Sequence, residues 1–230
     1  MVYASFTKAV SHRWTYVQRT IPGIDDYFVP LEEAIREKLI PSLIGRKVSD
    51  TERRIIALPV RYGGLGMRDP TNASSEFLAS SKVTEILTQI IVRQERDFSN
   101  YDQDEVKKCI EEVKKQKELR FKEELESIRE RSDVNQKMRR TLDLLQEKGS
   151  GAWLTALPIQ SLGYSLNKQE FRDSICLRYG WNIQNTPSHC QCGKENQIDH
   201  ALNCKSGGYV SMRHNRIRDL EAELLREVCK

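Results

Sequence analysis

Apolar residues recur at helical spacing near the start of the chain. Phe6, Val10, Trp14 and Val17 follow one another at steps of four, four and three, which places them on one face of a helix. This pattern predicts a first amphipathic helix over residues 3–19, ending before a Pro-Gly pair.

The next apolar positions predict a second amphipathic helix that begins near Asp25. Leu31, Ile35 and Leu39 would form its buried face. Pro41 is expected to kink its end, because proline lacks an amide hydrogen and clashes with the preceding turn.

Two short motifs predict how a third helix begins and ends. Ser49 and Glu52 have the spacing of a capping box, in which each side chain accepts a hydrogen bond from a free amide at the helix start. The helix should end at Leu58. The glycines of residues 63–66 suggest a phosphate loop, but no Gly-Lys-Ser/Thr follows them, so we predict a turn between helices.

The hydrophobic pattern divides the first 148 residues into two segments. An apolar helix over residues 74–93 completes a predicted helical bundle of residues 1–103, and the polar residues 97–102 are typical of a joint. Residues 104–148 contain 13 Lys and Arg and 12 Asp and Glu, without Gly or Pro. They predict a long charged helix or a helical hairpin, bent at residues 132–133. The irregular apolar stripe favours a solvated helix with a narrow packed face over a dimerising coiled coil.

A third segment, residues 149–230, is predicted to be a helical C-terminal region. An irregular apolar patch opens it, made of Trp153, Leu154, Leu157, Pro158, Leu162 and Tyr164. Asn167 and Glu170 then repeat the pattern of a helix start, for a helix that runs to Tyr179. The fold class is therefore mainly α.

Composition restricts where the protein works. The 230 residues are 38% hydrophobic and 30% charged, and no apolar run approaches the roughly 20 residues of a membrane span. The first residues lack the pattern of a signal peptide, so we expect an intracellular protein of the cytoplasm or nucleus, without a membrane partner. The net charge is only +4, so nucleic-acid binding must depend on local clusters.

Cysteine and histidine cluster near the C-terminus. Seven residues separate Cys192 from His200, and three separate His200 from Cys204, with Cys190 two positions before Cys192. Thiolate and imidazole suit tetrahedral Zn²⁺, and four protein ligands leave no open position, so the predicted zinc ion is structural. The predicted element covers residues 187–208.

The sequence leaves the fourth ligand open. His189 and His214 are both close enough in sequence to replace a ligand. Three unrelated buried thiols beside a surface histidine are the alternative to a metal site. The spacing of His200 and Cys204 favours these two residues as ligands together with Cys190 and Cys192, because it puts both side chains on one side of a helical turn.

A basic helix start follows the cluster. Arg213, Asn215, Arg216 and Arg218 could hold phosphates or stack on bases. A solvated helix end, paired with the acidic residues that follow, explains the same pattern equally well.

Six phrases together resemble the region that follows the polymerase palm in reverse transcriptases of non-long-terminal-repeat retrotransposons. The resemblance extends over nearly the whole chain, and it rests on residues 14–22 (WTYVQRTIP), 30–36 (PLEEAIR), 57–66 (ALPVRYGGLG), 190–193 (CQCG), 200–204 (HALNC) with Gly207 and Gly208, and 213–219 (RHNRIRD). The spacing within each half of the Cys/His cluster differs by one residue from the commoner Cys-x-x-Cys and His-x-x-x-x-Cys.

The resemblance implies a helical thumb, a linker and a Cys-Cys-His-Cys element that handles nucleic acid, with Cys190, Cys192, His200 and Cys204 as ligands. It also implies a palm before this region and often an endonuclease-like domain after it. We therefore expect a non-catalytic fragment that binds RNA or single strands weakly.

No pair of aspartates lies in an apolar strand hairpin of the kind that holds the two metals of a polymerase. Asp25 and Asp26 lie in a helical context and are interpreted as a helix start. The chain is thus not expected to be an enzyme. The alternative hypothesis is a structural or protein-interaction module, left from a degraded retroelement, that pairs through its charged helix.

Overall fold

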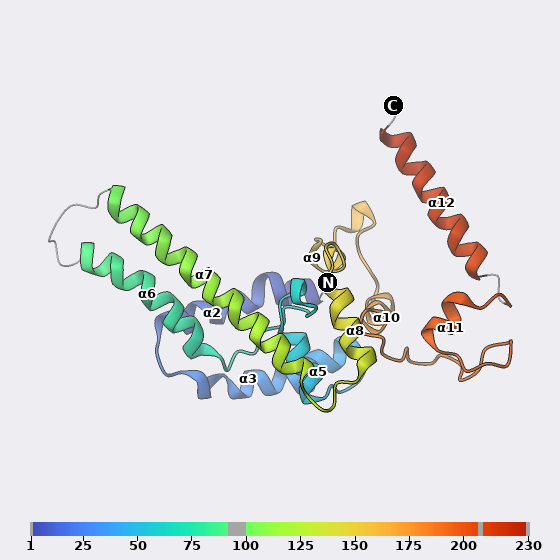
Figure 1. Ribbon diagram of the computed structural model, residues 1–230, viewed down its shortest axis with the longest axis horizontal. Helices are drawn as coiled ribbons and strands as arrows, with labels where there is room; N and C mark the ends of the chain where they lie inside the picture. The colour runs from blue at the N-terminus through green and yellow to red at the C-terminus, as the bar shows by residue number, and fades with distance from the viewer. Residues whose placement is uncertain (1, 92–99, 207–208, 229–230) are drawn as a thin grey trace. The chain divides into compact units, whose positions relative to one another are not determined.

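The computed structural model describes residues 2–91, 100–206 and 209–228 of the chain (Figure 1). Backbone contacts divide it into two compact units, Met1–Arg172 and Asp173–Lys230. This division differs from the three segments expected from composition, because the charged region packs within the first unit. The described residues are mainly helical and form no strand, as the sequence predicts.

The first helical run spans residues 2–20 as α1 (Val2–Ser5), a π-helical segment (Phe6–Val10) and α2 (Ser11–Thr20). Its extent agrees with the prediction, but its buried face does not. Val10 and Val17 are 43% and 38% exposed, whereas Thr15 and Gln18 are buried. A π turn holds one residue more than an α turn, so every later position rotates away from the face that the α-helical period predicts.

The second run repeats this feature. It consists of a 3₁₀ turn (Asp25–Phe28), α3 (Val29–Ala34), a π-helical segment (Ile35–Leu39) and α4 (Ile40–Ile44). Ile35 is buried as predicted, but Ile40 and not Leu39 occupies the next core position. The helix also continues past Pro41 and ends at Gly45, whose φ is +92°.

The capping box at the start of α5 (Asp50–Ala57) is confirmed. The Ser49 hydroxyl accepts from the Glu52 amide at 3.2 Å, and the Glu52 carboxylate accepts from the Ser49 amide at 2.9 Å. A 3₁₀ turn (Val60–Tyr62) leads into the glycine loop. The amides of residues 64–67 all donate to carbonyls of residues 56–59, so none is left to bind a phosphate. The predicted turn is confirmed.

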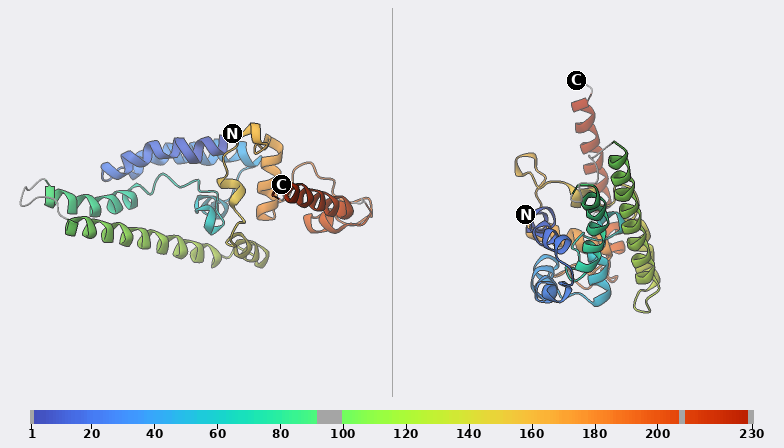
Figure 2. Two further views of the ribbon diagram at one scale, coloured as in Figure 1. Left: turned by 90° about the horizontal axis from the view of Figure 1, so that it is seen from above. Right: turned by 90° about the vertical axis from the view of Figure 1, so that its left-hand side faces the viewer.

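Two helices form an antiparallel pair, α6 (Ala73–Ile91) and α7 (Asn100–Arg129), and they run side by side in Figures 1 and 2. α2 packs against α6. The joint predicted at residues 97–102 lies outside the described residues, except that α7 already includes residues 100–102. Asp25, interpreted from sequence as a helix start, also caps α6: its carboxylate accepts from the Ser74 amide at 2.9 Å.

The charged region is two helices joined by a turn and not one continuous helix. α7 ends at Arg129, a turn follows at the predicted residues 132–133, and α8 (Gln136–Leu145) continues the chain. Asp133 in this turn accepts a hydrogen bond from Thr51 at 2.5 Å. Leu125 and Ile128 of α7 are buried in the first unit, so this part of its apolar stripe is not available for pairing with another chain.

The remaining elements of the chain are shorter. The irregular apolar patch contains α9 (Ala152–Thr155) and a 3₁₀ turn (Gln160–Leu162), and of its large side chains Leu154 alone is buried. α10 (Lys168–Tyr179) begins at the predicted Asn167 cap. The second unit contains α11 (Ile198–Asn203) and α12 (Tyr209–Val228). Among the described residues, no helix has both the length and the apolar character that crossing a membrane requires.

Candidate metal centre

A tight turn presents the first two cysteines of the cluster. The Cys190 amide donates to the Lys194 carbonyl and the Gly193 amide donates to the Cys190 carbonyl, both at 2.8 Å. Gly193 has a φ of +81°, a conformation that glycine adopts without steric cost. Neither Cys190 nor Cys192 has a positive φ, so the left-handed conformation of this turn falls on the glycine and not on either ligand.

A short helix presents the other two residues. His200 lies in α11, and Cys204 is the residue that ends it, with φ −69° and ψ 125°. The predicted i,i+4 relation therefore holds, although Cys204 has left the helical conformation. Cys204 is buried at 8% exposure, whereas Cys192 is exposed and the other two are partly buried.

The four side chains meet. One ligand atom from each of Cys190, Cys192, His200 and Cys204 lies within 4.8 Å of the other three. The Sγ atoms of Cys190 and Cys204 are 3.6 Å apart, and Cys192 Sγ is 3.2 Å from His200 Nε2. Tetrahedral zinc with ordinary bond lengths needs edges of about 3.8 Å between sulfurs and about 3.6 Å between sulfur and nitrogen. The two distances given above are shorter than these edges by about 0.2 Å and about 0.4 Å.

The alternative histidines are elsewhere. His189 Nδ1 contacts the Ser188 hydroxyl at 3.1 Å, and His189 is not part of the group of four. His214 lies in α12 and is not part of it either. The remaining described cysteines, Cys109 and Cys176, lie within α7 and α10 as predicted and do not join the cluster.

Backbone amides and neighbouring thiols shift the ionisation of two of the cysteines. The Ser206 amide and then the Cys190 thiol hold the pKa of the Cys204 thiol below its usual value. The Cys192 amide acts in the same direction on Cys190, but contacts with the thiols of Cys204 and Cys192, together with burial, leave the pKa of Cys190 raised. Thiolate is the form that binds metal, so the lowered pKa of Cys204 favours its metal-binding form.

Ser206 is a contributor that the sequence analysis did not name. Its amide acts on the sulfur of a residue two positions earlier. Metal-bound thiolates are usually oriented by hydrogen bonds of this kind from outside the ligand set. Every residue except proline supplies such an amide, so the residue type at this position gives no signal from which it could have been found.

The predicted basic residues lie next to this cluster in the chain, at the start of α12. Arg213, Asn215, Arg216 and Arg218 are all exposed. Arg218 pairs with Asp219 at 2.7 Å, while Arg213 and Arg216 have no ion-pair partner among the described residues. α11, which holds His200, packs against α12, so the basic residues belong to the same unit as the Cys/His cluster.

Comparisons with protein-family models, with curated proteins and with solved structures found no match to this chain.

Proposed function

We propose that residues 187–230 are a nucleic-acid-binding element held together by a structural zinc ion. We further propose that the whole chain is the non-catalytic region that follows the palm of a retrotransposon-type reverse transcriptase. The observation that carries the first proposal is the convergence of four ligand atoms within 4.8 Å. The second depends on the sequence resemblance alone.

Burial supports a structural role for the metal. From residue 182 to residue 206, Cys204 is the single buried side chain. Such a segment buries too little apolar surface to offset the conformational entropy lost when it becomes ordered. Metal binding supplies that free energy, and four protein ligands leave no open position for a water nucleophile.

Elemental analysis of protein purified without chelator tests the metal. We expect one zinc per chain, lost in Cys192→Ser and in His200→Ala. His189→Ala and His214→Ala are the matched controls and should keep the metal. If His214→Ala empties the site and His200→Ala does not, zinc is bound but through a different ligand set. A parent protein without zinc contradicts the proposal.

Nucleic-acid binding would be centred on Arg213, Arg216 and Arg218. With about three phosphate contacts, the slope of log affinity against log salt on single strands should be about −2, because each contact releases condensed counterions. The Arg→Ala triple variant should lose this binding. Arg226→Ala, at the other end of α12, is the control with the same chemistry. Equal binding by the triple variant and the parent at low salt would show that the helix start is only solvated.

Catalysis is not expected from this chain alone, because two-metal polymerisation needs an aspartate pair in an apolar strand hairpin, which the sequence does not show. We expect no nucleotide incorporation on a primed template with Mg²⁺ or Mn²⁺. Metal-dependent incorporation that disappears on replacing one aspartate would contradict this.

A further inference from the structure

A cavity of about 410 Å³ lies in the first unit, and none of its lining residues belongs to the Cys/His cluster or to the basic residues of α12. Its walls come from five places: the first helical run, α5, the loop after α5 that includes the glycine turn, α6 and α7. The volume falls within the range of small-molecule pockets, roughly 300–1,000 Å³. The lining residues come from segments that are far apart in sequence, so no local sequence motif predicts the cavity.

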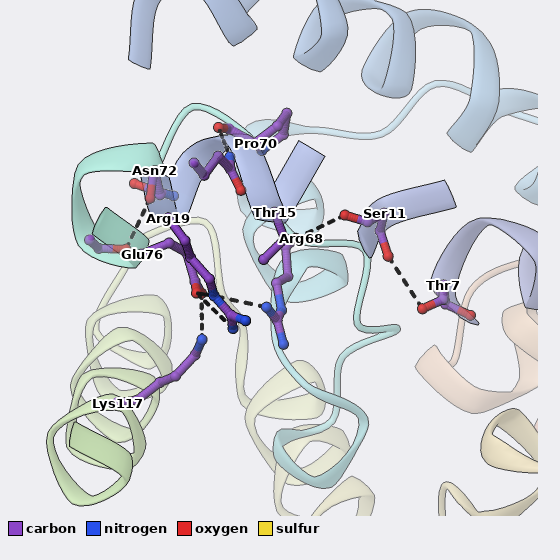
Figure 3. Close-up of polar contacts among 11 residues, drawn as sticks. Thr7, Ser11, Thr15, Arg19, Arg68, Pro70, Asn72, Glu76 and Lys117 are labelled. Atoms are coloured by element: carbon purple, nitrogen blue, oxygen red, sulfur yellow. Dashed lines mark hydrogen bonds and ion pairs between the residues drawn. The ribbon is translucent and has the colours of Figure 1, made fainter. Parts of the chain in front are cut away.

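Three cations converge on one carboxylate at this cavity (Figure 3). Glu76 of α6 accepts from Arg19 at 3.4 Å, from Arg68 at 3.5 Å and from Lys117 of α7. The Glu76 side chain is 12% exposed and that of Lys117 is 32% exposed. One negative charge is thus shared by three positive ones at a half-buried position.

The ionisation of these groups agrees with an excess of positive charge. Burial raises the pKa of Glu76, but Lys117, Arg68 and Arg19 outweigh it and leave that pKa below its usual value. Burial lowers the pKa of Lys117, Arg68 lowers it further, and the single carboxylate does not restore it. An additional anion would stabilise the charged form of Lys117.

The lining of the whole cavity also has more positive than negative side chains. Five cationic side chains line the cavity against three carboxylates: Arg53, Arg54, Arg68, Lys117 and Arg120 against Asp69, Glu76 and Glu124.

Several of these side chains already form ion pairs within the protein. Arg54 pairs with Glu124 at 2.8 Å. Arg53 pairs outside the lining with Glu32 at 2.6 Å. Arg120 has no ion-pair partner among the described residues, so it adds to the unbalanced positive charge beside Lys117.

The other walls suit a ring and its polar substituents. Trp14 and Phe121 line the cavity and are each partly exposed. Thr7, Ser11 and Thr15 line it at intervals of four along the first run, and each hydroxyl donates to the carbonyl four residues earlier. Their oxygens keep acceptor capacity for N–H groups of a ligand.

We propose that this cavity binds a phosphate ester of nucleotide size. The phosphate contacts Lys117, Arg120 and Arg68, and the ring lies against Trp14 or Phe121. Lysine and arginine bind phosphate oxygens through charge-assisted hydrogen bonds, and an aromatic ring stacks on a base of any identity. This inference is independent of the zinc element, which is in the other unit.

Calorimetric titration of the whole chain tests the proposal with four probes: AMP, adenosine, inorganic phosphate and a short single-stranded oligonucleotide. AMP should bind, and adenosine should bind at least about tenfold more weakly, because one charge-assisted contact is worth about that factor. The Lys117→Met and Arg120→Ala variants should each weaken AMP binding by a similar factor. Lys122→Ala, also exposed on α7 but outside the cavity, should change it less than about twofold.

The remaining outcomes are also decisive. An oligonucleotide that displaces AMP, and that loses affinity in the same two variants, identifies a strand as the source of the phosphate ester. If AMP binds and the oligonucleotide does not displace it, the ligand of the cavity is a free nucleotide. The inference is overturned if AMP does not bind at millimolar concentration, or if Lys122→Ala lowers its affinity as much as Lys117→Met does. Retention of AMP binding in Cys192→Ser separates this inference from the zinc proposal.

Discussion

At the scale of single residues, Gly64 is a position that cannot carry a side chain without a backbone shift. A Cβ atom there would lie 1.9 Å from the Leu58 carbonyl oxygen, which is backbone and cannot rotate away. We expect Gly64→Ala to lower the free energy of unfolding by about 3 kcal/mol or more. Urea denaturation measures it.

Gly66→Ala is the matched control for this substitution. Nothing lies within 4 Å of its added Cβ, although its φ is +67°. A left-handed conformation costs an L-residue about 1–2 kcal/mol, so this variant should be destabilised less than Gly64→Ala. Equal effects would mean that backbone conformation, and not the clash, limits the loop.

At the scale of elements, the π-helical segment before α2 determines which side chains of α2 are buried. Gln18 is 4% exposed and donates to the Pro70 carbonyl at 2.6 Å, whereas Val17 is 38% exposed. We expect Gln18→Ala to lower the free energy of unfolding by about 1–3 kcal/mol, because the carbonyl of Pro70 would lose its partner. Val17→Ala should change it by less than about 0.5 kcal/mol.

The two variants together test the rotation of the helix. Thermal or urea unfolding of each single variant gives the comparison directly. If Val17→Ala is the more destabilising change, the uninterrupted α-helical period that the sequence suggests describes this helix better than the π segment does.

At the scale of the whole molecule, Glu76 connects α6, which carries it, to three other segments. Its partners are Arg19 of α2, Arg68 of the loop before α6, and Lys117 of α7. Its pKa in the folded protein lies below the ordinary value of 4.5. Its contribution to stability is therefore fully present above about pH 4.5 and is lost as the pH falls through the folded pKa.

This dependence can be measured as the difference between two proteins. The urea midpoint of the parent should fall more between pH 6 and pH 3 than that of Glu76→Gln, which has no carboxylate to protonate. Loss of zinc in acid affects both proteins equally and cancels in the comparison. Parallel pH profiles would show that the three cations do not stabilise the folded protein through the ionised Glu76 carboxylate.

The two compact units should also respond differently to metal removal. A chelator should expose residues 187–206 to protease, because Cys204 is the single buried side chain there. The first unit has its own core, including Ile55, Ile56 and Ile128, and should stay protected. Limited proteolysis followed by mass spectrometry locates the cuts. Protection of residues 187–206 in metal-free protein would contradict a structural zinc ion.

Features that depend on neighbours in sequence were predictable from the sequence alone. The caps at Ser49 and Asn167 satisfy amides two or three residues away, and the turn at residues 132–133 needs only a local break in a helical pattern. The group of Cys190, Cys192, His200 and Cys204 spans fifteen residues, so its spacing already limits how far apart the ligands can lie.

Only the tertiary structure decided the features that depend on distant segments. The buried faces of the first two helical runs follow from π segments that a pattern of apolar residues does not reveal. Asp25 caps a helix that starts 48 residues later, and Glu76 meets Lys117 across 41 residues. The physical reason is the same in each case. A local pattern specifies what a residue can bond with, but the packing of whole helices determines which partners come within reach.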